Sequence, residues 1–292
     1  MIDVEGWAPE PHETTETIDP GPAHALAGVL DTDPPDGHLP PLWHWLHFLD
    51  RPAQRELGPD GHPLAGRFLP PIPERRRMFA GGRFTVRRPL PFGGTVTRRS
   101  ELASTALKHG RSGEMLFVTV RHTFVEGGEE IAVEEQDLVY RSGDPANRPA
   151  PPSFDEPEAD GPWLLWMTAD PTLLFRFSAL TYNAHRIHYD EKYATQVEGH
   201  PGLVVHGPLL AILCLELPRR AGRDVRRVSF RARSPVYAGQ PFAVTGAPGK
   251  DAGGAEGSDA AGGGEGGEGT GSGGELAVVA PGGITAMTAT FA

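Results

Sequence analysis

The chain has 292 residues, a formal net charge of -11 and an excess of glycine (38 residues) and proline (30 residues). Its length is enough for one large or two medium domains with a substantial core. The apolar content of 38% excludes a wholly disordered chain, the absence of periodic glycine excludes collagen, and the acidic charge argues against a broad nucleic-acid surface.

The first 40 residues are acidic and proline-rich and show little periodicity, which predicts an extended arm. They lack the basic start and continuous apolar core of a signal peptide, and no apolar run reaches the roughly 18 to 20 residues that span a bilayer. The single cysteine, Cys214, lies in an apolar run, where a buried and inert thiol is expected. We therefore expect a cytoplasmic protein with neither a membrane nor a nucleic acid as its partner.

Residues 41–143 form the first predicted domain. An aromatic cluster at 43–49 is expected to dock on its body. Four later segments combine β-branched residues, alternation and glycine-bearing breaks, which predicts antiparallel strands at 83–90, 93–109, 115–126 and 130–141. A second acidic, proline-rich segment at 144–162 is predicted to be a linker.

The second predicted domain covers residues 163–292. Gly207 and Pro208 are typical of the first turn of a helix, and the leucine-rich run after them is apolar on nearly all sides, which predicts a buried central helix. Strand-like segments follow at 225–246, 275–280 and 284–292. The glycine-rich stretch 246–274 is predicted to be a flexible insertion between two of them. It has no GK[ST] sequence and no following helix, which argues against a phosphate-binding loop.

The two halves show a weak internal repeat. Phe84–Gly93 aligns without gaps on Phe230–Gly239 with four identical residues, at an offset of 146 (230 minus 84). Because each half is also predicted to be rich in strands, two copies of one fold are the leading architecture.

A polar stretch at 181–190 lies between two apolar segments, so we expect it at the edge of a core. It contains Asn183, His185 and His188. One interpretation is that these side chains only cap turns. The other is acid-base chemistry, because the pKa of histidine lies near working pH. At the start of the apolar helix, the N–H groups that follow His206 could polarise a carbonyl.

Two other kinds of site are disfavoured. His185, His188 and Asp190 have a spacing that could hold a metal ion, but no HExxH motif, cysteine set or independent carboxylate pair supports it. A Ser-His-Asp triad lacks the G-x-S-x-G elbow. We therefore predict no metal and no cofactor.

Three segments, Phe175–Asp190, Glu198–Leu210 and Ser234–Gly239, resemble the MaoC-like hydratases and dehydratases. The most similar branch contains the mesaconyl-C4-CoA (3-methylfumaryl-CoA) hydratases and the mitochondrial-type 3-hydroxyacyl-thioester dehydratases. The resemblance implies an α+β double hotdog fold, in which two antiparallel sheets each wrap a long central helix. Residues 41–143 would be a degenerate copy and residues 163–292 the catalytic copy.

The resemblance also implies roles for single residues. The family motif D-x-N-x-x-H-x-D, followed by HG, places its acid-base histidine at His188 and its oxyanion-hole N–H at Gly207. Asn183 stands where the family has a catalytic aspartate. An amide cannot take a proton, so the implied role of Asn183 is to position water or the thioester.

The implied activity is the reversible hydration or dehydration of an enoyl or 3-hydroxyacyl thioester of CoA or acyl carrier protein, most similar to mesaconyl-C4-CoA hydration. Alternatives are a 3-hydroxyacyl-thioester dehydratase of fatty-acid type and a non-catalytic double hotdog that binds acyl thioesters. A thioesterase is a third alternative, but it would need a carboxylate aimed at the thioester carbonyl, and the motif offers only Asp190 for that role. Hotdog domains commonly pair their sheets, and a double hotdog already contains such a pair. The sequence is therefore compatible with both a monomer and a homodimer.

The first half is expected only to shape the acyl or CoA channel. Positions 37–42, which correspond to 183–188 minus 146, contain no Asn/His pair. Arg75, Arg76 and Arg77 either meet a phosphate or carboxylate of the substrate or form a solvated basic turn.

Overall fold

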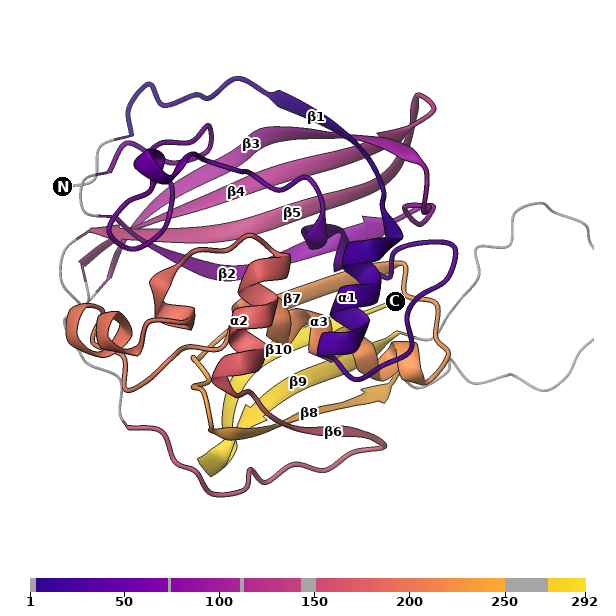
Figure 1. The fold of residues 1–292 in the computed structure, drawn as a ribbon, viewed down its shortest axis with the longest axis vertical. Helices are drawn as coiled ribbons and strands as arrows, with labels where there is room; N and C mark the ends of the chain where they lie inside the picture. Colours follow the sequence, from indigo (N-terminus) through magenta and orange to yellow (C-terminus); the bar gives the residue numbers. More distant parts are fainter. Residues whose placement is uncertain (1–3, 73–74, 111–112, 143–150, 250–272) are drawn as a thin grey trace, which may run out of the picture.

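The computed structural model describes residues 4–72, 75–110, 113–142, 151–249 and 273–292. Within these ranges, ten strands form one antiparallel sheet in the order β1-β3-β4-β5-β2-β7-β10-β9-β8-β6 (Figure 1). The predicted insertion lies outside the described residues from 250 to 272, and the predicted linker does so from 144 to 150.

The elements divide between two halves of the chain. The first half contains β1 (His12–Thr17), α1 (Pro20–Val29), η1 (Trp43–Leu46), η2 (Gln54–Glu56), β2 (Arg75–Val86), β3 (Thr95–Gly110), β4 (Gly113–Glu126) and β5 (Glu129–Ser142). The second half contains β6 (Trp163–Thr168), α2 (Pro171–Leu180), η3 (Arg186–His188), η4 (Tyr193–Val197), α3 (Gly207–Arg220), β7 (Arg227–Ala232), β8 (Pro241–Pro248), β9 (Gly274–Ala280), η5 (Pro281–Gly283) and β10 (Ile284–Phe291).

The strands predicted from alternation are all present, as β2 to β5 and β7 to β10. The first 40 residues differ from the expected extended arm, because they contain β1 and α1. β1 pairs with β3 along its whole length, and Ala23 and Leu26 of α1 are fully buried. In the sheet order, β1 occupies in the first half the edge position that β6 occupies in the second.

The two halves meet at the pairing of β2 with β7. Arg83 lies directly opposite Ser229, and these two residues are equivalent under the repeat offset of 146 (229 minus 83). The repeat therefore describes a pseudo-twofold arrangement centred on this strand pair. Gly81 allows its close approach, since a Cβ there would lie 2.3 Å from the carbonyl oxygen of Phe230, and its φ is 154°.

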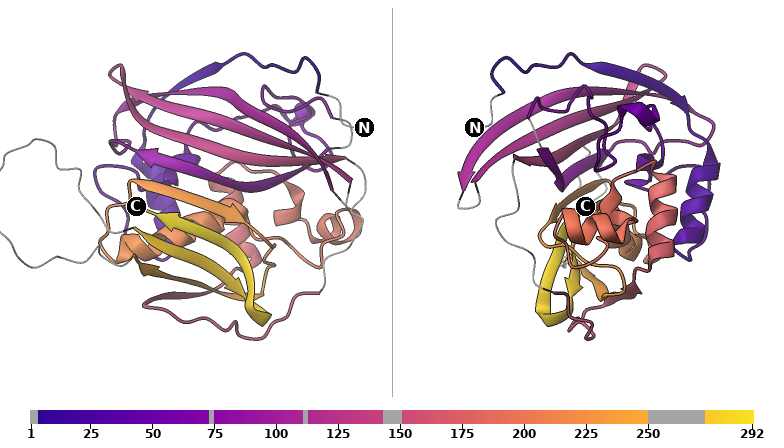
Figure 2. Two further views of the ribbon diagram at one scale, coloured as in Figure 1. Left: turned by 180° about the vertical axis from the view of Figure 1, so that it is seen from behind. Right: turned by 60° about the vertical axis from the view of Figure 1, so that its left-hand side comes forward.

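The expectation of two sheets, each around a long helix, is met only in part. The two sheets are joined edge to edge into one, and the second half packs on α3 (Figure 2). Among the described residues the first half has no equivalent long helix. Residues 43–48 pack there instead, with the ring of His44 against Phe84 and that of Phe48 against Phe124.

Helix α3 is the buried helix that the sequence predicts. Every residue from Leu209 to Pro218 is buried, including Cys214, whose thiol pKa is raised to about 12 by burial. Glu216 is also buried, and its carboxylate accepts hydrogen bonds from Arg219 in the last turn. The helix ends before Gly222, which has a left-handed φ of 66°. No helix in the described ranges is long and apolar enough to cross a membrane.

Candidate active site

A cavity of about 1370 Å³ lies between the two halves of the protein. The first half lines it with residues of η1, of the loop 48–63 and of β2 to β5, and the second half with residues of α2, of the loop 181–189 and of the start of α3. Asn183, His188 and Gly207, the three residues implied by the family motif, all line this cavity. Residues of both halves therefore have to be considered together as the lining of this cavity.

His188 ends the short turn η3 and is only 7% exposed. Its Nδ1 lies 2.7 Å from the carbonyl oxygen of Val204, which can only accept, so Nδ1 carries the proton and donates it. Burial lowers the pKa of His188 to about 4, although the hydrogen bond to Val204 opposes the shift. The ring is therefore neutral near pH 7, with an unprotonated Nε2 that can act as a base.

The ring of His206 packs against the ring of His188. The two imidazole rings are stacked, with centroids 3.7 Å apart and an interplanar angle of 18°. Nε2 of His206 is held 2.9 Å from the hydroxyl oxygen of Ser178 in α2. Burial, followed by the proximity of His188, moves the pKa of His206 well below its ordinary value, so the stacked pair carries no charge. The sequence interpretation placed His206 only as the residue before the helix.

Asn183 is fixed by its backbone and side chain together. Its N–H donates to the carbonyl oxygen of Ser178, and its Oδ1 accepts a hydrogen bond of 3.0 Å from the N–H of His185. This use of Oδ1 leaves the amide N–H groups, for which no partner is found within the described ranges. The side chain can therefore donate to a water or a substrate oxygen in the cavity.

Gly207 is the first residue of α3, and no carbonyl is found to accept from its backbone N–H in the described part of the chain. A Cβ at this position would lie 2.9 Å from Cδ1 of Phe79, so the missing side chain lets Phe79 of β2 pack on the helix start. An unpaired N–H at a helix N-terminus that faces a cavity can stabilise negative charge on a carbonyl oxygen.

Gly207→Ala is expected to lower kcat/KM by about tenfold to hundredfold, because Phe79 must move and displaces a substrate bound at the helix start. Helix stability should not suffer, since alanine is a good helix former. Assays of the thioester hydration that the sequence resemblance implies, together with thermal unfolding, would measure the two effects. Unchanged kcat/KM would show that the helix start does not contact the substrate.

Asp190 does not take part in the rival metal site. Its carboxylate accepts from Nη2 of Arg186 at 2.7 Å and from the N–H of Tyr193 at 3.0 Å, and it does not line the cavity. These hydrogen bonds, that from Tyr193 first, lower the pKa of Asp190. Asp190 instead stabilises the turn that carries His188, because Arg186 belongs to η3.

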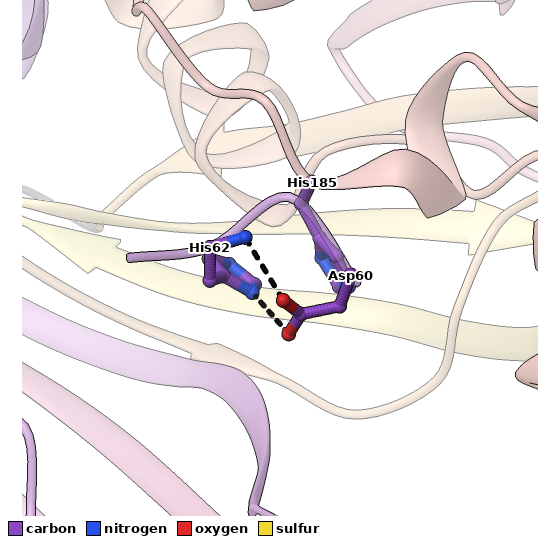
Figure 3. A group of neighbouring side chains, drawn as sticks. All are labelled: Asp60, His62 and His185. Carbon is purple, nitrogen blue, oxygen red and sulfur yellow. Dashed lines mark hydrogen bonds and ion pairs between the residues drawn. The ribbon is translucent and has the colours of Figure 1, made fainter. Parts of the chain in front are cut away.

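The first half supplies a second group of polar residues, which sequence reasoning missed. Asp60 and His62 line the cavity, and the ring of His62 lies against that of His185, with centroids 4.1 Å apart (Figure 3). Nδ1 of His62 is 3.0 Å from one carboxylate oxygen of Asp60, and the other oxygen accepts from the N–H of His62. Burial, with the nearby His62 second, lowers the pKa of His185, which is therefore neutral.

The ligand atoms of Asp60, His62 and His185 lie within 4.8 Å of one another, which is close enough to examine as a metal site. However, both carboxylate oxygens of Asp60 are already used in hydrogen bonds with His62, one with its backbone N–H and the other with its Nδ1. The observed geometry is thus that of a hydrogen-bonded carboxylate-imidazole pair.

Two arginines of β2 also line the cavity. Nη1 of Arg76 forms an ion pair of 3.1 Å with Glu198, so its charge is matched. Arg77 is half-buried and close enough to lower the pKa of His185, after burial and the two neighbouring histidines. Within the described ranges the guanidinium of Arg77 has no hydrogen-bond or ion-pair partner. The side chain of Arg75 is outside the described part.

Residues 42–238 match the family model of hydroxyacyl-thioester dehydratase type 2. Over 237 residues, which are 78% of this chain and 84% of the relative, the sequence is 45% identical to mesaconyl-C(4)-CoA hydratase of Chloroflexus aurantiacus. The structure is similar to that of a MaoC-like dehydratase from Phytophthora capsici, with a TM-score of 0.67, 16% identity and coverage of 99% of this chain and 97% of the other.

A Mycobacterium tuberculosis protein described as having a double hotdog fold is also similar. The TM-score is 0.56 and the identity 14%, over 97% of this chain and 95% of the other. This likeness shows that the fold is a double hotdog.

Proposed function

Because the chain belongs to the hydroxyacyl-thioester dehydratase type 2 family, we propose that it reversibly hydrates an enoyl thioester to a 3-hydroxyacyl thioester. The substrate inferred from the 45% identical relative is mesaconyl-C4-CoA or a similar dicarboxylic thioester. The observation that carries the proposal is the neutral His188, whose Nε2 is available as a base in a cavity that also contains Asn183 and the helix start at Gly207.

The proposed mechanism assigns one task to each of the three residues. The N–H of Gly207 donates to the thioester oxygen and stabilises the enolate that forms when water adds to the β carbon. His188 takes a proton from that water, and Asn183 positions the water through its amide. This division explains why an amide at position 183 is compatible with catalysis, because the base is the neighbouring histidine.

Ultraviolet absorbance tests the proposed function. The purified protein is incubated with crotonyl-CoA, mesaconyl-C4-CoA or a crotonyl acyl carrier protein, and the enoyl band and free thiol are followed. Loss of the band without free thiol means hydration. Free thiol means a thioesterase, and neither signal means a protein that only binds acyl thioesters; both of these results contradict the proposal.

Arg77 offers a prediction about the acyl group. An unpaired guanidinium beside the catalytic histidines is suited to bind the free carboxylate of a dicarboxylic thioester. Arg77→Met is expected to raise KM for mesaconyl-C4-CoA by about tenfold or more, at roughly 1.5 to 3 kcal/mol for a hydrogen bond to a charged group. KM for crotonyl-CoA, which has no free carboxylate, should change little. An equal effect on both substrates would instead indicate contact with the CoA portion.

The carrier, the location and the assembly belong to the same proposal. We infer a CoA carrier because the similar hydratase is named for a CoA thioester. For the location, the buried and unpaired thiol of Cys214 fits the reducing conditions of the cytoplasm.

We further propose that the first half is a degenerate hotdog domain and the second half the catalytic hotdog domain. Analytical ultracentrifugation would distinguish a monomer from a homodimer.

A further inference from the structure

The loop 58–62 of the first half packs closely on the loop that carries His188 and forms hydrogen bonds with it. Gly61 has a φ of 89°, and a Cβ there would lie 1.8 Å from the carbonyl oxygen of Ala184, so only glycine fits at this contact. The N–H of Arg186 donates to the carbonyl oxygen of Asp60 at 2.9 Å, and its guanidinium donates to that of Pro59 at 2.8 Å. The position of His62 is therefore set relative to His188 by backbone contacts.

Asp60 gives His62 a charged partner. Burial alone would raise the pKa of Asp60, but the hydrogen bonds and charge of His62 outweigh burial and leave that pKa below its ordinary value. Asp60 is thus a carboxylate, and it accepts a hydrogen bond from Nδ1 of His62, which fixes the orientation of the ring. Nε2 of His62 has no hydrogen-bond partner within the described ranges, and the residue lines the cavity.

Titratable groups from several segments lie around His62. From the loop 183–188, the half-buried His185 lies against it and the buried His188 lies behind His185, and the pKa values of both are below the ordinary value. His200, before α3, lowers the pKa of both rings, and Arg77, on β2, lowers that of His185. Asp60 is the carboxylate that hydrogen-bonds to His62. The site thus combines a neutral base with an imidazole that has its own carboxylate, an arrangement typical of separate acid and base roles.

We propose that His62, held by Asp60, is the proton donor of the active site and that the degenerate first half therefore takes part in the chemistry. The inference rests on the proposed function. In hydration, an O–H bond of water breaks and its proton goes to Nε2 of His188, while the oxygen bonds to the β carbon. The π electrons move to the α carbon, which takes the proton from Nε2 of His62. The extra proton on His188 returns to His62 through solvent, so one water is added overall.

The test compares the full-length protein with His62→Gln and Asp60→Asn on an enoyl thioester that the native protein hydrates. His109→Gln is the matched control, because His109 lies exposed on β3 and contacts only Glu114 among described ion-pair partners. We expect His62→Gln to lower kcat by about 10²-fold or more while KM changes less than about threefold. Asp60→Asn should lower kcat by about tenfold or more while KM changes less than about threefold, because the amide no longer fixes the imidazole as the carboxylate does.

Each other outcome overturns the inference. His62→Gln or Asp60→Asn within threefold of native kcat shows that the pair only positions the loop. Thermal unfolding of both variants is measured, and a folded Asp60→Asn protein keeps the test valid if His62→Gln does not fold. If a chelator abolishes native activity and zinc restores it, the pair holds a metal instead. A native protein that hydrates no enoyl thioester overturns the proposed function as well, whereas an active one that needs His188 but not His62 overturns only this inference.

Discussion

His188→Ala is expected to lower the hydration rate by about 10²-fold or more, because it removes the neutral base whose Nδ1 is anchored on Val204. KM should change much less, since the walls of the cavity and the N–H of Gly207 remain. Initial rates of loss of the enoyl band, measured beside thermal unfolding, check the prediction. A variant that retains activity within about tenfold of native would exclude His188 as the base.

The pH dependence gives an independent check of the same residue. His188 accepts a proton only when it is neutral, and its pKa is lowered to about 4 by burial. Above that pH the base is available, and it is lost as pH falls through about 4. The acid limb of kcat/KM should therefore lie near pH 4, well below the ordinary pKa of histidine. An acid limb near pH 6.5 would mean that a solvent-exposed histidine is the base.

Glu134→Ala is expected to lower the free energy of unfolding by about 3 to 5 kcal/mol, because it removes a buried carboxylate that accepts three hydrogen bonds. Glu134 is fully buried on β5, and its carboxylate accepts from Nε2 of His44 at 2.9 Å, from the indole of Trp45 at 2.6 Å and from Gln136 at 2.9 Å. Removing it leaves the buried His44 and the two part-buried donors of Trp45 and Gln136 without this acceptor. Urea unfolding measures the loss.

Glu135→Ala is the matched control for this change. Glu135 is the next residue of β5, and it pairs with Arg83 and Arg121 at the surface. Such exposed pairs contribute at most about 1 kcal/mol. Equal losses for the two variants would contradict the role of the buried carboxylate.

The stability that Glu134 contributes should also depend on pH. Burial would raise its pKa, but the charge and hydrogen bond of His44 outweigh burial and lower the pKa from 4.5 to about 2. A carboxyl group whose pKa is lower in the folded protein stabilises it fully above the unfolded value. The contribution is therefore present above about pH 4.5 and is lost between there and about pH 2. The difference between native and Glu134→Ala proteins should shrink over that range.

Sequence periodicity was a good guide to the sheet but not to its edges. The strands β2 to β5 and β7 to β10 alternate between apolar and polar residues because one face is buried. β1 has the sequence HETTET, and none of its residues is fully buried, so it has no apolar alternation to recognise. It is a strand because β3 offers it hydrogen bonds along an open edge. The amino-acid sequence of β1 by itself therefore does not predict its pairing with β3.

The candidate site divides in the same way. Asn183, His188 and Gly207 lie in one continuous stretch, so the motif was visible in the sequence and the structure places all three on one cavity. Asp60 and His62 were not found, because the repeat offset led to positions 37–42. In the first half an irregular segment stands where the second half has α3, so the repeat does not hold there.

The sequence by itself determined the antiparallel strands and the buried helix α3, because both follow from local periodicity. Its resemblance to a family motif also indicated the segment that carries the proposed site residues. Only the tertiary structure decided that the two sheets join through β2 and β7, that His206 stacks on His188, and that Asp60 and His62 reach the site. The strand pairing and the approach of Asp60 and His62 exist because the two halves bury their faces against each other around one cavity, whereas the stacking of His206 on His188 comes from the folding of the second half.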